Sequence, residues 1–187
     1  MNQKKIFNES IEYIQKKIKE ILNKVSQEDI EKVEKLFFKT NRIFVYGAGR
    51  SGLVAKAFAI RLIHLGFQAF VIGETITAPV KKGDLVLIIS GSGETIPAIM
   101  TAEIAHKIGA HVVSITGKKD SKIAKFANIT LFIASSCNEK ERKKYAPLGT
   151  LFEASVWILL DGFVAELLHS KNETEDIMRG RHATLEH

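Results

Sequence analysis

Short, unbroken apolar runs alternate along most of this chain with segments of helical periodicity. A run that lacks a polar residue at every second position is typical of a strand covered on both faces, as in parallel sheets. Alternation of such strands with helices predicts an α/β fold, in which a five-stranded parallel sheet is flanked by helices. The expected strands are residues 42–46, 68–72, 85–89, 111–115 and 129–133.

Helical periodicity also predicts two helices before the first strand, and we expect them to form an N-terminal helical hairpin. The first covers residues 7–22, and the second begins near Ser26, which is followed by Asp29 in the pattern of a helix start. Their apolar faces suit contacts with the domain or with another subunit. The later helices are expected at residues 51–64, 96–108, 122–126 and 150–169, before a polar tail. One side of the helix at 51–64 is expected to carry Leu53, Ala57 and Ile60.

The composition limits the classes of partner. The formal net charge is +6, but the lysines are dispersed in pairs, so we expect a basic surface that favours anionic substrates and no nucleic acid. A single cysteine, Cys137, excludes an intramolecular disulfide and a multi-cysteine metal site. The chain start has no signal-peptide pattern, and no apolar run approaches the roughly 18 residues of a membrane span. We therefore expect a cytoplasmic protein without a membrane partner.

Two segments rich in glycine and serine follow two of the expected strands. Gly47-Ala48-Gly49-Arg50-Ser51-Gly52 comes after the strand at 42–46, and Ser90-Gly91-Ser92-Gly93-Glu94-Thr95 comes after the strand at 85–89. In open parallel sheets the ligand lies at the carboxyl ends of the strands, where both segments fall. Glycines let the backbone approach an anion, the first N–H groups of the next helix point at it, and hydroxyls add donors. Together the segments predict a pocket for a small phosphorylated molecule.

Each segment also has an alternative interpretation. The first matches the dinucleotide-binding pattern G-x-G-x-x-G, for which Glu74 would be the ribose-binding acid. That interpretation leaves the second segment unexplained. The second segment could simply cap a helix, but one cap needs one hydroxyl and three are present. A third hydroxyl-bearing loop, residues 116–121, is expected to be an ordinary connection between a strand and a helix; lining of the pocket wall is the alternative.

The second segment resembles the S-x-S-x-x-[ST] loop with which the sugar isomerase (SIS) domain binds phosphosugars. The sequence also resembles the 6-phospho-3-hexuloisomerases within that family, over nearly the whole chain and most weakly before the first strand. Besides the first glycine segment, the stretches that carry this resemblance are residues 61–67, 71–75, 147–153 and 181–186. One departure is Thr184, where the family usually has asparagine.

The resemblance implies a single SIS domain with the three-layer sandwich of flavodoxin-like and Rossmann-like folds. We expect residues 1–40 to be helices of the same domain, residues 41–170 to form the α/β unit, and residues 171–187 to form a tail over the active site. The resemblance also implies a homotetramer, built as a dimer of dimers. The histidines lack ligand spacing and no acidic cluster accompanies them, so no metal is expected.

The activity that the resemblance implies is an isomerisation in the ribulose monophosphate route of formaldehyde fixation. The family interconverts D-arabino-hex-3-ulose 6-phosphate and D-fructose 6-phosphate through an enediol or enediolate. No cofactor is needed, because hydrogen returns as a proton. Two alternatives are another SIS isomerase, for example one for arabinose 5-phosphate, and a non-catalytic phosphosugar sensor.

Such a reaction needs a base, a proton shuttle and donors for the enediolate. Glu153 is the leading candidate base, although Thr150 three residues earlier also makes it part of a capping-box pattern. His182, in the tail, and His64 are the other catalytic candidates, and a buried core role is an equal alternative for His64. The sequence leaves open which of the three is the base, and whether the tail serves its own subunit or a neighbour. The residues expected to bind substrate are Gly49, Arg50, Ser51, Ser90, Gly91, Ser92, Gly93, Glu94 and Thr95.

Overall fold

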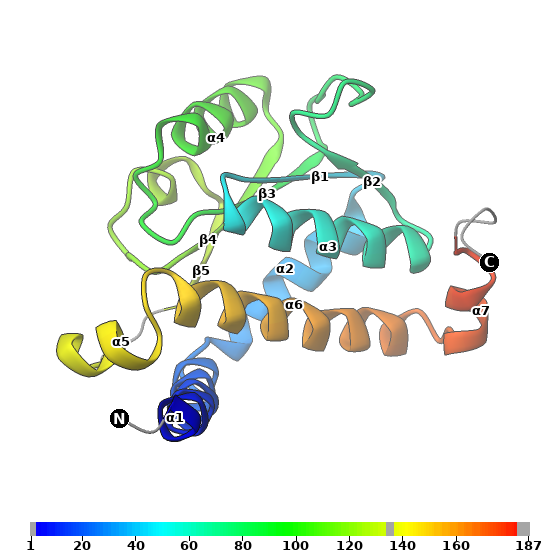
Figure 1. Ribbon diagram of the computed structural model, residues 1–187. Coiled ribbons are helices and arrows are strands. Elements are labelled where there is room, and N and C mark those ends of the chain that lie inside the picture. The colour runs from blue at the N-terminus through cyan, green and yellow to red at the C-terminus, as the bar shows by residue number, and fades with distance from the viewer. Residues whose placement is uncertain (1–2, 134–136, 183–187) are drawn as a thin grey trace.

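The computed structural model describes residues 3–133 and 137–182, and at its centre is the expected five-stranded sheet (Figure 1). All strand pairings are parallel, and the strands lie in the order β2-β1-β3-β4-β5. The predicted fold class is therefore confirmed, and each strand agrees with its expected bounds to within one residue. The strands are β1 (Arg42–Gly47), β2 (Gln68–Val71), β3 (Leu85–Ile89), β4 (His111–Thr116) and β5 (Ile129–Phe132).

The strand order contains a topological switch between β1 and β3. From β1 the chain moves outward to β2 on one side, and it then returns to build β3, β4 and β5 on the other. β1 and β3 pair up to their carboxyl ends, where Gly47 lies opposite Ile89. The two glycine-containing segments, residues 47–52 and 90–95, therefore start side by side, at the crevice where open α/β sheets bind ligands.

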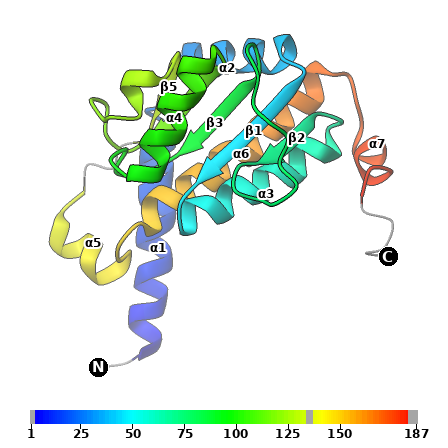
Figure 2. The same cartoon turned by 90° about the horizontal axis from the view of Figure 1, so that it is seen from above.

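Helices cover both faces of the sheet and complete a three-layer sandwich (Figures 1 and 2). The helices are α1 (Gln3–Leu22), α2 (Gln27–Lys39), α3 (Arg50–His64), α4 (Ile96–Ile108), α5 (Glu139–Tyr145), α6 (Thr150–Ser170) and α7 (Glu175–Arg179), with a 3₁₀ turn η1 (Ala124–Phe126). One face packs against α2, α3 and α6, in a core that includes Val45 and Leu87. The other face packs against α4, in a smaller core around Phe44 and Ile88.

The apolar side that the sequence pattern indicates for α3 is not the side that packs against the sheet. Val54, Phe58 and Leu62 are buried in the core, whereas Leu53 and Ile60 are 63% and 54% exposed. Both sides of this helix carry apolar residues, so periodicity alone does not indicate which side meets the sheet. The exposed apolar side lines part of a groove between α3 and α6.

The two N-terminal helices attach to the body at separate places. Ser26 begins α2 as expected, because its hydroxyl accepts a hydrogen bond from the Asp29 N–H at 3.2 Å. α2 buries Phe37, whose ring makes edge contacts with Phe58 of α3 and Phe163 of α6. α1 packs mainly against α5 and α6, and Figure 2 shows it extending away from the sheet.

The sequence pattern does not predict the two short helices α5 and α7. Both are largely polar, so apolar periodicity carries no signal for them. Asn138 begins α5, because its side chain accepts hydrogen bonds from the N–H groups of Lys140 and Glu141. α7 lies in the segment expected to be a polar tail, and it buries Met178. Across residues 3–133 and 137–182, no helix is both long enough and apolar enough to span a membrane.

Candidate active site

Residues 90–95, here called the serine loop, gather three hydroxyl groups at the N-terminus of α4. Ser90 Oγ donates to Thr95 Oγ1 at 3.3 Å, and Ser92 Oγ lies 3.5 Å from the same atom. Thr95 is the N-cap residue of α4, yet its side chain makes no capping hydrogen bond. The three hydroxyls thus lie close together, and capping of α4 does not account for this arrangement.

The two serines of this loop have different surroundings. Ser90 is buried, and its hydroxyl also accepts the Gly93 N–H at 3.2 Å, so it holds the loop in shape. Ser92 is exposed, accepts the Glu94 N–H at 3.2 Å and lines a cavity. The Ser92 side chain is therefore open to the cavity, whereas the buried Ser90 hydroxyl stabilises the loop from inside.

The loop after β4 packs directly against the serine loop. The Gly117 N–H donates to the Gly91 carbonyl at 3.0 Å. Gly93 has a φ of +63°, and a Cβ there would lie 2.3 Å from the Cβ of Ser121. Besides connecting β4 to η1, this loop therefore also lines the cavity beside the serine loop, through Gly117.

In the first glycine loop, residues 47–52, two positions require glycine because the backbone is closely packed, and a third has a positive φ angle that favours glycine. A Cβ on Gly47 would lie 2.6 Å from the backbone of the first turn of α3, and one on Gly52 would lie 2.6 Å from the Gly47 carbonyl oxygen. Gly49 has a φ of +57°. Glu74, the acid that a dinucleotide site would use, forms an ion pair with Lys56 of α3. The glycine pattern is therefore explained without a dinucleotide.

Folding brings Glu153, the leading candidate base, to the first glycine loop. Glu153 lies in the first turn of α6, and its Oε2 is 3.0 Å from Nε of Arg50 in the first turn of α3. Only 14% of the Glu153 side chain is exposed, compared with 68% of the Arg50 side chain. The site thus holds a nearly buried carboxylate beside a guanidinium that solvent reaches.

The backbone at the start of α6 positions this carboxylate. The N-cap residue is Gly149, whose carbonyl accepts the Glu153 N–H at 3.0 Å. A Cβ on Gly149 would lie 2.5 Å from Glu153 Oε1, so the carboxylate folds back over this glycine. The Thr150 hydroxyl donates instead to the Pro147 carbonyl at 2.6 Å. The capping-box interpretation of Thr150 and Glu153 is therefore wrong.

Two hollows meet at Glu153. The first, of about 390 Å³, joins Glu153 to the serine loop; it is lined by Gly91, Ser92, Gly117, Ile133, Gly149, Phe152 and Glu153. The second, of about 440 Å³, extends from Glu153 over α3 and α6; it is lined by Arg50, Leu53, Val54, Thr150, Glu153, Ala154, Trp157 and Ile158. Glu153 is therefore reached both from the serine loop and from the surface between the two helices.

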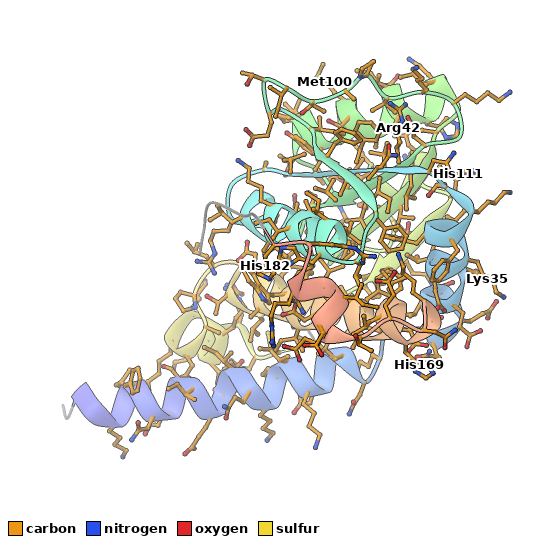
Figure 3. All side chains as sticks on the ribbon, turned by 90° about the vertical axis from the view of Figure 1, so that its right-hand side faces the viewer. Lys35, Arg42, Met100, His111, His169 and His182 are labelled. Carbon is orange, nitrogen blue, oxygen red and sulfur yellow. The ribbon has the colours of Figure 1, made fainter. Side chains whose placement is uncertain are left out.

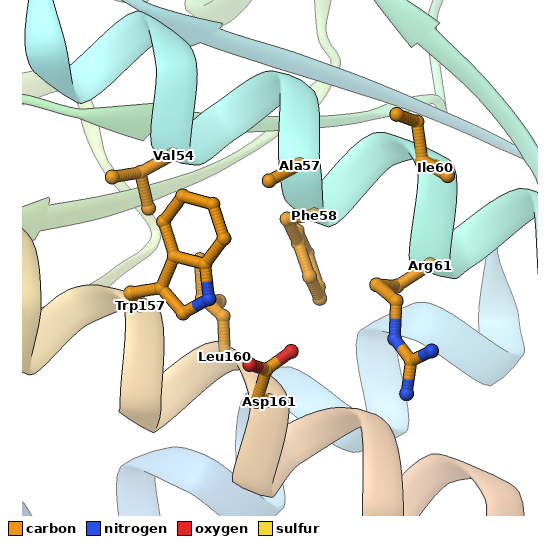
Figure 4. A pocket seen from close by; sticks show the side chains of 8 residues that line it. All are labelled: Val54, Ala57, Phe58, Ile60, Arg61, Trp157, Leu160 and Asp161. Atoms are coloured by element: carbon orange, nitrogen blue, oxygen red, sulfur yellow. The ribbon is translucent and has the colours of Figure 1, made fainter.

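A groove of about 540 Å³ continues between α3 and α6 (Figure 4). Ala57 and Ile60, from the exposed side of α3, line it together with Trp157 of α6. Trp157 is 46% exposed, which is unusual for so large an aromatic side chain. At the other end of the groove, Arg61 and Asp161 lie on facing helices (Figure 4).

The other two catalytic candidates, His64 and His182, lie together at the opposite end of α3. Their ring centroids are 3.9 Å apart and the rings are nearly parallel, at 21°. His64 is buried, and Figure 3 shows His182 beside α7. α3 has 15 residues, so at about 1.5 Å per residue its two ends are roughly 20 Å apart. One chain therefore does not bring these histidines to Glu153.

Ion pairs hold the beginning of the tail against this end of α3. Arg181 donates to the His64 carbonyl at 3.1 Å and to Glu173 at 2.6 Å. The Lys171 ammonium lies 3.2 Å from the same carboxylate. The hydrogen bond from Arg181 holds the pKa of Glu173 below its usual range. The final part of the resemblance, residues 183–186, lies outside the described residues.

The sequence matches one described protein family. The SIS domain model matches residues 36–156, a span that includes both glycine-containing loops and Glu153. An uncharacterized protein of Archaeoglobus fulgidus is 40% identical over 179 residues, which cover 94% of this chain and 98% of that protein. The 3-hexulose-6-phosphate isomerase of Bacillus subtilis is 36% identical over 181 residues, which cover 94% of this chain and 98% of that enzyme.

A solved structure resembles the whole fold. The crystal structure of a Methanococcus jannaschii protein, from which a function of 3-hexulose-6-phosphate isomerase was inferred, superposes with a TM-score of 0.85 at 32% identity. The superposition covers 95% of this chain and 99% of the other. The similarity therefore extends beyond the serine loop to nearly every helix and strand.

Proposed function

The chain belongs to the SIS domain family, and from this premise we propose that it is an isomerase that interconverts D-arabino-hex-3-ulose 6-phosphate and D-fructose 6-phosphate. Relatives named 3-hexulose-6-phosphate isomerase that match over almost their full length support this reaction. We assign it to the ribulose monophosphate route of formaldehyde fixation. The observation that carries the proposal is that Glu153 lines the same cavity as Gly91 and Ser92 of the serine loop.

The reaction moves a carbonyl group from C3 to C2 of the sugar phosphate. A base removes the proton from C2, and the electron pair left behind forms the C2=C3 enediolate. The proton is then delivered to C3, while a second proton moves between the oxygens on the two carbons. Atoms and electrons balance without an oxidant or a reductant. In this proposal Glu153 is the base, because a largely buried carboxylate beside the bound sugar suits general-base catalysis.

Arg50 has a second role in this proposal. Negative charge develops on an oxygen of the enediolate, and a guanidinium placed beside that oxygen stabilises it. Arg50 is paired with Glu153 in the free protein, but 68% of its side chain is exposed. A substrate oxygen can therefore replace Glu153 as its partner. That exchange would release the carboxylate as a base when the sugar is bound.

We assign the phosphate group of the substrate to the serine loop. Ser92 is exposed at the cavity, and Thr95 stands at the N-cap of α4 without a capping hydrogen bond. The N–H groups at a helix start carry partial positive charge and favour an anion. The sugar end of the substrate would then extend from the serine loop toward Glu153 and Arg50.

We further propose that His64 and His182 act in the site of a second subunit. In one chain they stack at the opposite end of α3 from Arg50. A twofold axis through the middle of α3 would place the His64 end of one helix beside the Arg50 end of the other. One of these histidines would then carry the proton between the two oxygens of the enediolate.

Two exposed apolar surfaces support an assembly of four subunits. One lies on α3 and α6 and includes Leu53, Ile60, Trp157 and Ile158, which are 46–63% exposed. The other lies on α4 and includes Ile96, Met100, Ile104 and Ile108, at every fourth position and 38–71% exposed. Contiguous exposed apolar surfaces mark interaction sites. Two different self-complementary contacts, one on each side of the sheet, produce a dimer of dimers.

The deciding experiment supplies the purified protein with hex-3-ulose 6-phosphate and follows formation of fructose 6-phosphate. We expect turnover by the native chain, none by Glu153→Gln, and normal turnover by Glu166→Gln, an exposed glutamate on the same helix. Turnover of arabinose 5-phosphate but not of hex-3-ulose 6-phosphate would show that the protein is a different SIS isomerase. Phosphosugar binding without any turnover would favour a sensor.

A further inference from the structure

Two lysines of the loop after β4 are attached to the serine loop by one of its own carboxylates. Lys118 Nζ lies 3.6 Å from Glu94 Oε1, and Lys122 Nζ lies 3.2 Å from Glu94 Oε2. The backbone N–H of Lys122 also donates to Glu94 Oε1, at 3.3 Å. Because Glu94 is part of the serine loop, these contacts hold two ammonium groups at the edge of the site assigned to phosphate.

The backbone beneath Lys118 is fixed against the serine loop. Its N–H donates to Thr116 Oγ1 at 3.2 Å, and Thr116 is fully buried. The preceding residue, Gly117, donates to the Gly91 carbonyl and lines the same cavity as Ser92. The Lys118 side chain, by contrast, is 60% exposed. The backbone of Lys118 is therefore fixed beside the cavity, while its exposed side chain can reorient its ammonium group toward a ligand.

The charges around the cavity favour a phosphate only if these lysines are counted. A sugar phosphate carries a charge of nearly −2 at neutral pH. The hydroxyls and N–H groups of the serine loop are uncharged, and Arg50 offsets only one of the two carboxylates, Glu94 and Glu153. The hydrogen bond from Lys122 lowers the pKa of Glu94, so this carboxylate is ionised at neutral pH. Without the lysines the cavity edge would repel the substrate, and with them it attracts it.

We propose that Lys118 and Lys122 bind the phosphate group of the substrate, and that Glu94 holds their side chains at the serine loop in the free protein. This inference rests on the proposed function of the serine loop and adds the cations that recognise the dianion. A phosphate carries more negative charge than a carboxylate, so it competes for both ammonium groups. The site should therefore discriminate strongly between a phosphorylated sugar and the same sugar without phosphate.

The test measures binding of inorganic phosphate and of fructose 6-phosphate by calorimetry, together with kcat and KM. We expect both ligands to bind about tenfold more weakly to the double variant Lys118→Gln/Lys122→Gln, with a higher KM and little change in kcat. Lys118→Arg keeps the charge and should retain most of the affinity. Lys119→Gln is the matched control, because Lys119 is exposed and forms no ion pair within residues 3–133 and 137–182.

Two outcomes would overturn this inference. One is an unchanged affinity of the double variant for inorganic phosphate. The other is an equal loss in Lys119→Gln, which would indicate a general effect of surface charge. Calorimetry does not depend on turnover, so it separates this inference from the proposed reaction. A protein that binds fructose 6-phosphate through the lysines but does not isomerise hexulose phosphate would support the inference and refute the reaction.

Discussion

The Arg50 guanidinium lies 3.0 Å from the Glu153 carboxylate, although the two residues are 103 positions apart in the chain. Each occupies the first turn of its helix, and packing of α3 against α6 brings the two turns together. The contact joins the first glycine loop to the helix that carries the proposed base. In the proposed mechanism, a bound substrate replaces Glu153 as the partner of Arg50.

Replacing Arg50 by glutamine should lower kcat by roughly 10² to 10³, because the enediolate loses a charged donor. Inhibition by inorganic phosphate should change little, since the serine loop is intact. Steady-state kinetics with phosphate as a competitive inhibitor measure both effects. Lys56→Gln removes another cation from α3 and serves as the control. If kcat stays normal in Arg50→Gln, Arg50 has no role in stabilising the enediolate.

Replacing Gly149 by alanine should reduce kcat more than it raises KM. The added Cβ would lie 2.5 Å from Glu153 Oε1, so the carboxylate must move away from its position beside Arg50. Gly149 has a φ of −84°, which alanine adopts without strain. Gly162→Ala, on the exposed side of the same helix with nothing near the new Cβ, is the control. It should stabilise the fold by up to about 1 kcal/mol. Equal kcat values for the two variants would contradict the positioning role of Gly149.

Ser92→Ala and Ser90→Ala should have different effects, although both remove one hydroxyl from the serine loop. Ser92 is exposed at the cavity, so its loss should raise KM by a factor that corresponds to about 1 kcal/mol or more and leave stability unchanged. Ser90 is buried and accepts the Gly93 N–H, so its loss should lower the melting temperature as well. Kinetics and thermal unfolding of both variants provide the comparison. A normal KM in Ser92→Ala would indicate that the phosphate group of the substrate binds elsewhere.

Mixed oligomers should test whether His182 serves a neighbouring subunit. Glu153→Gln and His182→Ala should each be inactive alone, because the first lacks the base and the second lacks either the proton carrier or the ring stacked on it. When the two variants are unfolded and refolded together, some sites would combine a native Glu153 from one subunit with a native His182 from the other. We expect these mixtures to regain activity. A mixture as inactive as its components would refute the proposed role of His182 in the site of a neighbouring subunit.

The Glu173–Arg181 ion pair should make docking of the tail sensitive to acid. The folded-state pKa of Glu173 lies below its usual value of 4.5. Its contribution to stability is therefore complete above about pH 4.5 and disappears as the pH falls through the lowered pKa. The difference in unfolding free energy between the native chain and Glu173→Gln, measured by denaturant titration, should shrink in that range. Glu175→Gln, whose side chain is 82% exposed beside Arg179, should show no such change.

Local patterns predict much of this structure because the interactions that define them are short in range. The five apolar runs predict the strands, and Ser26 predicts the start of α2 through a hydrogen bond to a residue three positions away. Likewise Ser90, Ser92 and Thr95 lie within one loop, so a single helix start brings their hydroxyls together. The helices α5 and α7 escape prediction because their stability depends on a cap and on tertiary contacts, not on an apolar stripe.

The sequence by itself determined the order of the strands and longer helices along the chain, the two loops at the crevice and the identity of Glu153 as a candidate base. Only the tertiary structure decided which groups meet that carboxylate. Packing of α6 on α3 places Arg50 beside it, and the loop after β4 brings Lys118 and Lys122 to Glu94. The structure also separates the histidine pair from Glu153 within one chain. The Arg50–Glu153 contact depends on which apolar face of α3 is buried, and periodicity does not distinguish two apolar faces of one helix. The lysine contacts with Glu94 depend on the pairing of β3 with β4, which places the loops after these strands side by side.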